Sequence, residues 1–100
     1  MAEEDMQEPR PAFVYMVRCG NGSLYTGWTT DVAARFAAHA SGKGARYTRA
    51  FGAKAIAYTE QLPDKNQALK REAAIKKMPR AQKEQLCAAW AASAEQENGE

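Results

Sequence analysis

Hydrophobic and polar positions along the chain divide it into short apolar segments and longer amphipathic ones. Two apolar segments, 13–17 and 24–29, are rich in β-branched and aromatic residues and are too short for typical helices, so they predict two β-strands. The residues between them, 20–23 (Gly-Asn-Gly-Ser), suit a tight turn and would join the strands into a β-hairpin. The segment 53–60 (AKAIAYTE) predicts a third strand.

Three helices are predicted in the rest of the chain. Residues 32–41 are alanine-rich and follow Asp31, a residue type that caps helix N-termini. A second helix is predicted over 64–78, where a proline follows, and a third over 80–94. The glycine-rich segment 42–52 is predicted to be a loop.

These elements fit one small domain. A chain of 100 residues with 45% apolar residues can bury a single modest core. We place the domain at 12–94, between a flexible acidic N-terminal segment, 1–11, and a disordered acidic tail, 95–100.

The folded part of the chain is strongly basic. The whole chain has a formal net charge of +2, but seven of its twelve acidic residues lie in 3–8 and 95–100. The part between them therefore has five acidic residues against all fourteen Lys and Arg, a surplus of nine positive charges. Such a surplus favours a polyanionic partner, most often nucleic acid, although an ordinary soluble surface can have the same composition.

The cysteines and the N-terminal segment indicate a reducing compartment. Cys19 and Cys87 have no CxxC partner, and one histidine cannot complete a structural zinc site with them, so we expect two free thiols. No apolar run approaches the ~20 residues of a membrane span, and the acidic start does not resemble a signal peptide. We expect a cytoplasmic protein without a membrane partner.

One carboxylate lies on the apolar face of the second helix. At about 100° per residue, Glu72 is three residues from both Leu69 and Ile75 on that face. A carboxylate there is partly desolvated, which is unfavourable unless a cation neutralises it. Two interpretations stay open: an ion pair with an arginine from elsewhere, or a ligand for Mg²⁺, which in phosphate chemistry often takes one or two carboxylates plus waters.

The first helix places two polar residues beside its apolar stripe. Val32, Phe36 and Ala40 recur every four residues and predict the buried side, and Arg35 and His39 lie one turn apart on its border. Such residues often only extend to solvent or pack against the core. The alternative is that both join the hairpin tyrosines and the helix carboxylate in one site.

In their order and spacing these residues resemble the GIY-YIG nuclease domain. The resemblance rests on Tyr15, then Tyr25, Thr26 and Gly27 ten residues later, Arg35 ten beyond, His39 one turn on, and Glu72 on a later helix. It covers about residues 12–90 and looks most like the small stand-alone members. Of the first triplet, 13–15, the chain keeps only the tyrosine, and its last predicted helix lacks the asparagine of some members, since Asn98 lies in the tail.

The resemblance implies a mixed α+β domain, with a three-stranded antiparallel sheet packed with about three helices in ββαβαα order. It also implies hydrolysis of DNA phosphodiester bonds with one divalent cation, Mg²⁺ or another such as Mn²⁺. Position by position, Glu72 would hold the metal, Arg35 would neutralise charge on the attacked phosphate, and Tyr15 would be the general base. Tyr25 would orient water or phosphate, and His39 would transfer a proton or contact a phosphate.

Tyr15 can act as a base at neutral pH only if its pKa is lowered. A free tyrosine titrates at about 10. Positive charge from Arg18, Arg35, His39 or the metal would lower this pKa, and a metal-bound water would ease the same step.

The predicted nucleic-acid contacts lie mainly in the 42–52 loop. Lys43, Arg46 and Arg49 around Tyr47 combine cations with an aromatic ring, which suits phosphate contacts and base stacking, although a solvated loop would look the same. The resemblance adds Gly27, which would allow close approach of a backbone.

Two functions are therefore expected as alternatives. The first is a metal-dependent DNA endonuclease that is structure-dependent or weakly sequence-selective and serves DNA repair or recombination. The second is a nucleic-acid-binding module on the same fold with little or no cleavage activity. RNA stays open as a substrate or ligand in both.

The first alternative fixes the register of the hairpin. A two-residue turn at Asn21-Gly22 would place Tyr15 and Tyr25 on opposite faces of the sheet, whereas an odd-length loop such as 20–22 places them on one face. A shared active site requires the second arrangement, so we predict the odd-length loop.

Overall fold

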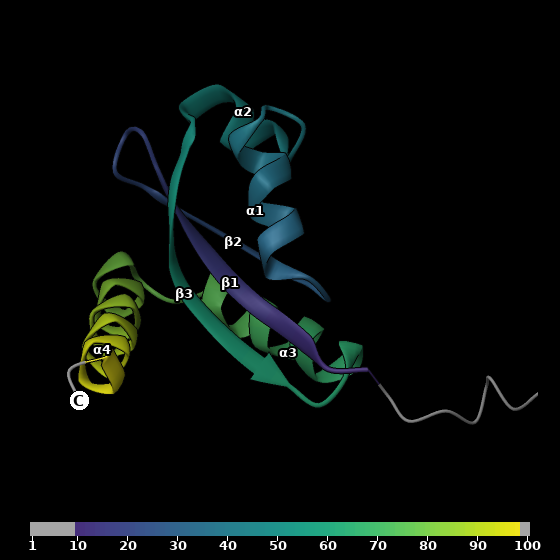
Figure 1. Cartoon of the computed structure of the whole chain (residues 1–100), viewed down its shortest axis with the longest axis vertical. Coiled ribbons are helices and arrows are strands. Elements are labelled where there is room, and N and C mark those ends of the chain that lie inside the picture. Colours follow the sequence, from purple (N-terminus) through teal and green to yellow (C-terminus); the bar gives the residue numbers. More distant parts are fainter. Residues whose placement is uncertain (1–9, 99–100) are drawn as a thin grey trace, which may run out of the picture.

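Seven elements follow one another along the chain in the order ββααβαα (Figure 1). They are β1 (Ala12–Cys19), β2 (Leu24–Thr29), α1 (Val32–Ala40), α2 (Arg46–Phe51), β3 (Ala53–Leu62), α3 (Lys65–Lys76) and α4 (Arg80–Asn98). The computed structural model describes residues 10–98. Most of the predicted flexible segment 1–11 therefore lies outside the described residues, as does the end of the predicted tail.

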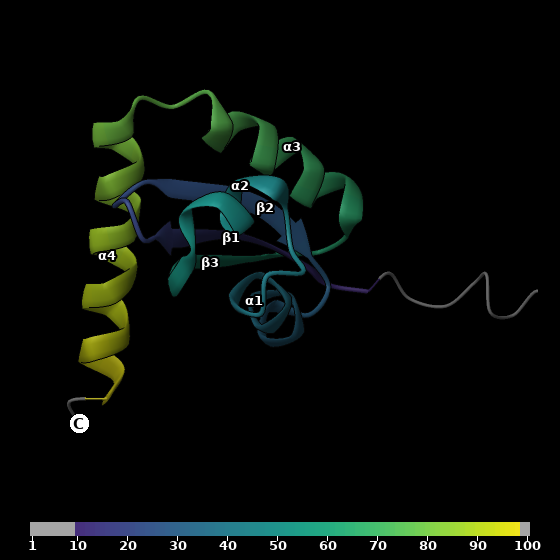
Figure 2. The ribbon, with the colours of Figure 1, turned by 90° about the horizontal axis from the view of Figure 1, so that it is seen from above.

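The apolar strand β1 is the centre of the fold. It pairs antiparallel with both neighbours in a three-stranded sheet of order β2-β1-β3. Residues 14–17 are at most 1% exposed, because helices cover both faces of the sheet. Figure 2 shows α1 against one face and α3 against the other. The predicted α+β class with a three-stranded antiparallel sheet is confirmed.

Side chains of β1 alternate between two apolar clusters, one on each face of the sheet. The cluster on the α3 side is formed by Ala12, Val14, Met16, Tyr58, Ala68, Ile75 and Cys87. The cluster on the α1 side is formed by Tyr15, Val17 and Cys19, with Tyr25, Phe36 and Ile56 packed against it. The pattern of β1 thus positions Tyr15 in the layer between the sheet and α1.

A three-residue loop, 20–22, closes the hairpin. The Cys19 amide donates to the Ser23 carbonyl at 2.8 Å, and the Gly22 amide donates to the Cys19 carbonyl at 2.9 Å. Gly22 has φ +87°, a left-handed conformation that glycine adopts without a Cβ clash and that three-residue hairpin loops commonly use. The predicted odd-length loop is confirmed.

Short polar contacts fix the ends of the helices. Asp31 and Asp64 cap α1 and α3. Each carboxylate accepts a hydrogen bond from the backbone amide three residues later, at 3.0 Å for Asp31 and 2.9 Å for Asp64. The start of α4 is tied to the hairpin by Glu84, which accepts two bonds from Arg18 at 2.6 and 2.7 Å. Arg80 adds a bond to the Gly22 carbonyl at 2.8 Å.

Some predicted elements need correction. Residues 46–51 form the helix α2 where a loop was predicted, and β3 continues two residues past its predicted end to Leu62. Helix α4 continues to Asn98, past the predicted end at 94 and into the segment expected to be disordered. The extra helix changes the predicted ββαβαα order to ββααβαα.

Two predicted apolar faces are also partly wrong. In α1 the buried residue is His39, at 2% exposure, while Ala40 is exposed. In α3 the buried residues are Ala68 and Ile75, and Leu69 is 38% exposed. The histidine can be buried because both of its ring nitrogens have hydrogen-bond partners.

Both cysteines are buried free thiols, as predicted. None of the helices in the described part of the chain is both long enough and apolar enough to cross a membrane.

Candidate active site

The hairpin register brings the two predicted tyrosines to the same face of the sheet. Tyr15 lies opposite Gly27, and Val17 lies opposite Tyr25, so all four side-chain positions share the α1 face. The ring centroids of Tyr15 and Tyr25 are 6.4 Å apart. The arrangement that a shared active site requires is therefore present.

Gly27 makes room for the Tyr15 phenol. A Cβ at this position would lie 2.6 Å from the Tyr15 hydroxyl and 2.9 Å from the ring carbon that bears it. Because no real Cβ is found that close to another heavy atom, the phenol can occupy this place only if residue 27 is glycine. The position is buried. Packing against Tyr15 thus accounts for this glycine without the contact to nucleic acid that we predicted.

His39 connects Tyr15 to α2 through two hydrogen bonds. Its Nε2 is 2.9 Å from the Tyr15 hydroxyl, and its Nδ1 is 2.8 Å from Oγ1 of Thr48. The Thr48 hydroxyl donates its one proton to the Ala45 carbonyl at 2.9 Å. Thr48 Oγ1 must therefore accept a proton from Nδ1–H, which leaves Nε2 as the acceptor for the Tyr15 hydroxyl. This chain of bonds assigns the neutral Nδ1–H tautomer to His39.

Electrostatics in the site keep the proton on Tyr15. Burial, and secondarily the nearby Tyr25, raise the pKa of Tyr15 to about 12, although Arg35 acts in the opposite direction. Burial, with the charge of Arg35 as a second cause, lowers the pKa of His39 from its usual value. A tyrosine base would need a lowered pKa, but nearby positive charge does not lower the pKa of Tyr15 overall, because desolvation outweighs it.

Arg35 and Glu72 reach this pair from two different helices. Arg35 is exposed on α1, and its charge acts on both Tyr15 and His39. The charge of Glu72, on α3, also acts on the pKa of Tyr15. Tyr15, Tyr25 and His39 are therefore in contact, with ring centroids 6.4, 5.8 and 5.3 Å apart, whereas Glu72 lies on the helix over the other face of the sheet and has the smallest of these effects on Tyr15.

Glu72 is desolvated as expected, and its ion pair is with a lysine and not with the arginine that one of the two open interpretations named. The side chain is 16% exposed, and its Oε2 is 3.1 Å from Nζ of Lys76, one turn later on α3. The partner is therefore a lysine of the same helix. The sequence contains the signal for this pair, a Glu four residues before a Lys.

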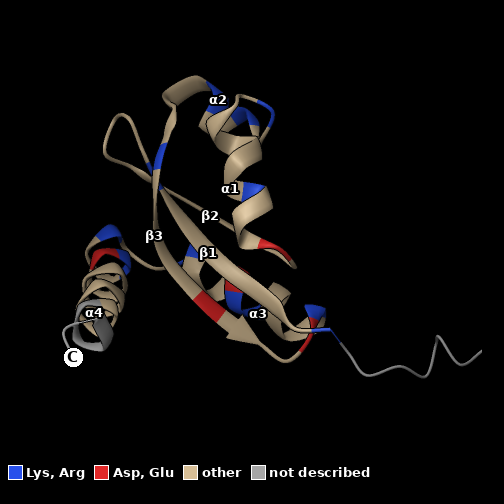
Figure 3. Ribbon diagram, viewed as in Figure 1, with Lys and Arg blue, Asp and Glu red and all other residues tan. Residues whose placement is uncertain are grey.

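The predicted nucleic-acid residues are divided between the site and the surface. Tyr47, 39% exposed, stacks on Tyr25 with ring centroids 6.2 Å apart, and its hydroxyl donates to Ser23 at 2.6 Å. Phe51 packs beside Tyr47 at 4.9 Å. Lys43, Arg46 and Arg49 are exposed, and Figure 3 shows basic positions along this α1–α2 region and at the start of α4.

Two adjoining cavities form a basic groove between β2 and the junction of α3 with α4. The first, of about 200 Å³, is lined by Leu24, Tyr25, Thr26, Tyr47, Lys76 and Lys83. The second, of about 170 Å³, shares Leu24 and Lys83 with it and adds Ser23 and Arg80. The groove therefore has an aromatic wall next to the site and three cations on its helical side. We refer to it below as the basic groove.

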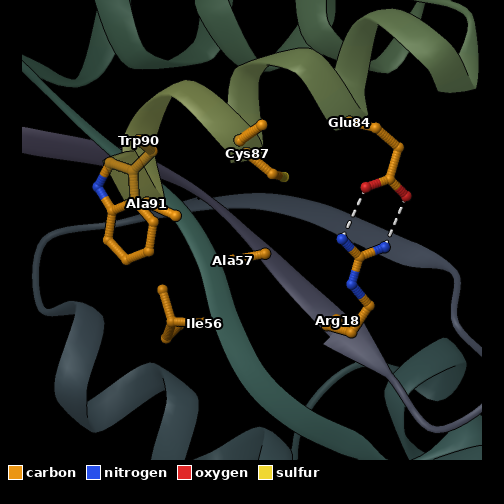
Figure 4. Close-up of a pocket in the computed structure, with 8 residues that line it drawn as sticks. Arg18, Ile56, Ala57, Glu84, Cys87, Trp90 and Ala91 are labelled. Atoms are coloured by element: carbon orange, nitrogen blue, oxygen red, sulfur yellow. Dashed lines mark hydrogen bonds and ion pairs between the residues drawn. The ribbon is translucent and has the colours of Figure 1, made fainter. Parts of the chain in front are cut away.

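A larger cavity, of about 340 Å³, lies between β3 and α4 and has different chemistry. Figure 4 shows its lining, with Trp90 at one end and the Arg18–Glu84 pair at the other. The two charged groups bind each other through two hydrogen bonds, and the rest of the lining is mainly apolar. This cavity does not contain the predicted site residues.

Sequence reasoning missed two parts of the site. Thr48 had no distinguishing signal, because its role depends on α2 bringing it to His39 across nine positions of sequence. Lys76 was not among the predicted site residues, although its spacing from Glu72 predicts the ion pair.

Fold and site together define a small α+β domain with a buried tyrosine–histidine pair, and with a lysine-paired carboxylate on the helix over the other face of the sheet. The family described as the GIY-YIG catalytic domain matches residues 11–85. The chain belongs to this family, which confirms the resemblance seen in the sequence and indicates a nuclease.

The similar proteins are small UPF0213 proteins. One from Cupriavidus pinatubonensis is 47% identical over 83 residues, which cover 83% of this chain and 92% of that protein. One from Halobacterium salinarum is 47% identical over 73% of this chain and 95% of its own length. The solution NMR structure of a UPF0213 protein from Bacillus halodurans matches with a TM-score of 0.51 and 44% identity, covering 79% of this chain and 84% of that one.

Proposed function

We propose that this chain is a metal-dependent endonuclease that hydrolyses DNA phosphodiester bonds in DNA repair or recombination. The observation that carries the proposal is the hydrogen-bonded Tyr15–His39 pair in contact with Tyr25, whose ring lines the same groove as Lys76, the partner of Glu72. Membership of the GIY-YIG family and the basic surface of the domain support it. The chain has no dedicated base-reading element in its described part, so we expect preference for DNA structure or weak sequence selectivity.

The Glu72 carboxylate is the group that would hold the metal. It is mostly desolvated and already interacts with a cation, and Mg²⁺ in phosphate chemistry often takes only one or two protein carboxylates. Among the side chains that the structure describes, no group of three His, Cys, Asp or Glu could hold a metal ion, so the other ligands would be waters and substrate oxygens. When bound, Mg²⁺ or Mn²⁺ would supply charge neutralisation at the phosphate and a water of lowered pKa.

Tyr15 and His39 together can move one proton without a free phenolate. Tyr15 would accept the proton of the attacking water while its own proton passes to Nε2 of His39, and Thr48 would stabilise the resulting imidazolium at Nδ1. The oxygen of this water forms a bond to phosphorus as the bond from phosphorus to the leaving nucleotide oxygen breaks. This relay avoids the free phenolate that a Tyr15 pKa of about 12 disfavours, and it needs the negative charge of a bound phosphate to offset the lowered pKa of His39.

Arg35 and Tyr25 would act on the phosphate itself. Arg35 is exposed, permanently charged and forked, so it can neutralise negative charge that develops on the attacked phosphate. Tyr25 is the more exposed of the two hairpin tyrosines and would orient the water or a phosphate oxygen.

The test is cleavage of labelled single-stranded, duplex and branched DNA, and of RNA, with and without Mg²⁺ or Mn²⁺. We expect metal-dependent cleavage by the wild type and none by Glu72→Ala. If both proteins bind DNA equally and neither cuts with any metal tested, the enzyme proposal is wrong, and the chain is a nucleic-acid-binding module on the same fold.

A further inference from the structure

Lys76 links the basic groove to the proposed metal ligand. Its side chain lines the groove together with Lys83, and its Nζ is 3.1 Å from Oε2 of Glu72. The cation that neutralises this desolvated carboxylate is therefore a lysine that also lines the groove. Any metal that binds Glu72 has to displace the Lys76 ammonium or bind against the repulsion of its positive charge.

The Glu72–Lys76 pair is suited to opening. Lys76 is 54% exposed, and exposed i,i+4 ion pairs contribute little to stability. Its flexible four-carbon stem lets the ammonium move between nearby anions. Glu72 is only 16% exposed, so leaving its carboxylate without a neighbouring cation would be unfavourable.

The groove has the features of a phosphate subsite. Lys76, Lys83 and Arg80 approach it from two helices, and the rings of Tyr25 and Tyr47 form its opposite wall.

We propose that the basic groove binds a phosphate of the DNA backbone next to the one being cleaved, and that Lys76 then moves from Glu72 to this phosphate. The Glu72 carboxylate would become available to the divalent metal only when DNA is bound. This inference rests on the proposed function and adds the order of binding. A DNA phosphate draws Lys76 away from Glu72, and a metal bound to Glu72 releases Lys76 for the phosphate. DNA and metal therefore bind with positive coupling. By linkage, each raises the affinity of the other by the same factor.

The first experiment measures Mn²⁺ binding to the free protein by calorimetry. Lys76→Met should bind Mn²⁺ about two- to fivefold more tightly than the wild type, the range expected from releasing one partly exposed ion pair. Lys77→Met is the matched control, because it removes the same charge at the next position of the chain. Equal Mn²⁺ affinities for the Lys76→Met and Lys77→Met variants would overturn the proposal.

The second experiment measures the affinity for a fluorescein-labelled DNA duplex by polarisation, with and without Ca²⁺ at constant ionic strength. Ca²⁺ should strengthen DNA binding by the wild type and should do so much less in Lys76→Met. Lys83→Met should weaken DNA binding while keeping the Ca²⁺ effect, because Lys83 lines the groove without pairing with Glu72. A Ca²⁺ effect of the same size in Lys76→Met as in the wild type would contradict the exchange.

The two experiments separate this inference from the proposed function. If the wild type cleaves DNA with Mg²⁺ but Lys76→Met changes neither Mn²⁺ nor Ca²⁺ behaviour, only the exchange is wrong. If no variant binds Mn²⁺ and the wild type does not cleave, both fail.

Discussion

At the scale of single residues, Gly27 provides the most direct test of how the site is packed. Its substitution by alanine would place a Cβ 2.6 Å from the Tyr15 hydroxyl, so the phenol would have to move away from His39. We expect Gly27→Ala to lower the free energy of unfolding by about 1–3 kcal/mol, the usual cost of overpacking. Urea denaturation followed by circular dichroism measures this change.

The control for this prediction is to make Gly27→Ala also in a protein that carries Tyr15→Phe, which removes the hydroxyl but keeps the ring. Part of the clash is with the hydroxyl and part with the ring carbon, so Gly27→Ala should cost less in Tyr15→Phe than in the wild type. An equal cost in both backgrounds would show that the hydroxyl does not occupy the space beside residue 27.

Thr48 determines which nitrogen of His39 carries the proton. Because the chain has one histidine, its long-range ¹H–¹⁵N spectrum is free of overlap. We expect a protonated Nδ1 and an unprotonated Nε2 in the wild type at pH 7.5, and a mixture of tautomers in Thr48→Val, which lacks the acceptor for Nδ1–H. Thr48→Ser should restore the wild-type spectrum. A protonated Nε2 in the wild type would contradict the hydrogen-bond assignment.

The lowered pKa of His39 predicts how stability depends on pH. As the pH falls through about 6.5, the unfolded state takes up a proton that the folded state refuses, so the free energy of unfolding decreases. The decrease attributable to this group is at most about 1.4 kcal/mol per pH unit and ends at the folded pKa. Denaturation of wild type and His39→Gln between pH 7.5 and 5.5 should show the extra slope in the wild type. Parallel profiles would mean that burial does not lower the pKa of His39.

The residues of the site were predictable to the extent that their role is local. Glu72 could be placed on a desolvated face from helical periodicity, and its pairing with Lys76 follows from their spacing. Thr48 could not be found, because its hydroxyl has a role only after α2 packs beside α1. The raised pKa of Tyr15 depends in the same way on the burial of the hairpin in three dimensions.

At the scale of elements, an ion pair at the start of α4 helps to hold this helix against the hairpin, beside the apolar packing of Cys87, Leu86 and Trp90. Arg18 and Glu84 are about one-third exposed, at 30% and 35%, and bind through two parallel hydrogen bonds. We expect Glu84→Ala to cost about 1 kcal/mol in free energy of unfolding, the upper part of the range for partly exposed pairs with good geometry. Arg80, 65% exposed and 3.3 Å from Glu84, is the control, and Arg80→Ala should cost a few tenths of a kcal/mol. Equal costs for the two variants in urea denaturation would contradict a special role for the Arg18 pair.

The elements themselves were predictable where local chemistry determines them. Asp31 and Asp64 begin helices because each carboxylate accepts a bond from the backbone amide three residues later, the third residue of the helix. The six-residue helix α2 was missed because a helix this short has little stability of its own and its segment is rich in glycine. It is held by contacts from outside the segment, the stacking of Tyr47 on Tyr25 and the bond of Thr48 to His39.

At the scale of the whole molecule, the basic groove lies next to the proposed catalytic residues. The surplus of nine positive charges over residues 9–94 is a property of the sequence, but its arrangement is not. The fold brings Lys76, Arg80 and Lys83 to a groove whose aromatic wall includes Tyr25. A polyanion bound in this groove would therefore lie beside the proposed catalytic residues.

The central claim is that the residues around Tyr15 form a metal-dependent phosphodiesterase centre. The most direct test is the single-turnover cleavage rate of labelled branched DNA in Mg²⁺ at saturating protein, for the wild type and Glu72→Ala. Loss of the metal ligand removes several kcal/mol of transition-state stabilisation, so we predict that the rate falls by about 10³-fold or more while DNA binding is retained. Equal rates for the two proteins, or no cleavage by a wild type that binds the DNA, would contradict the claim.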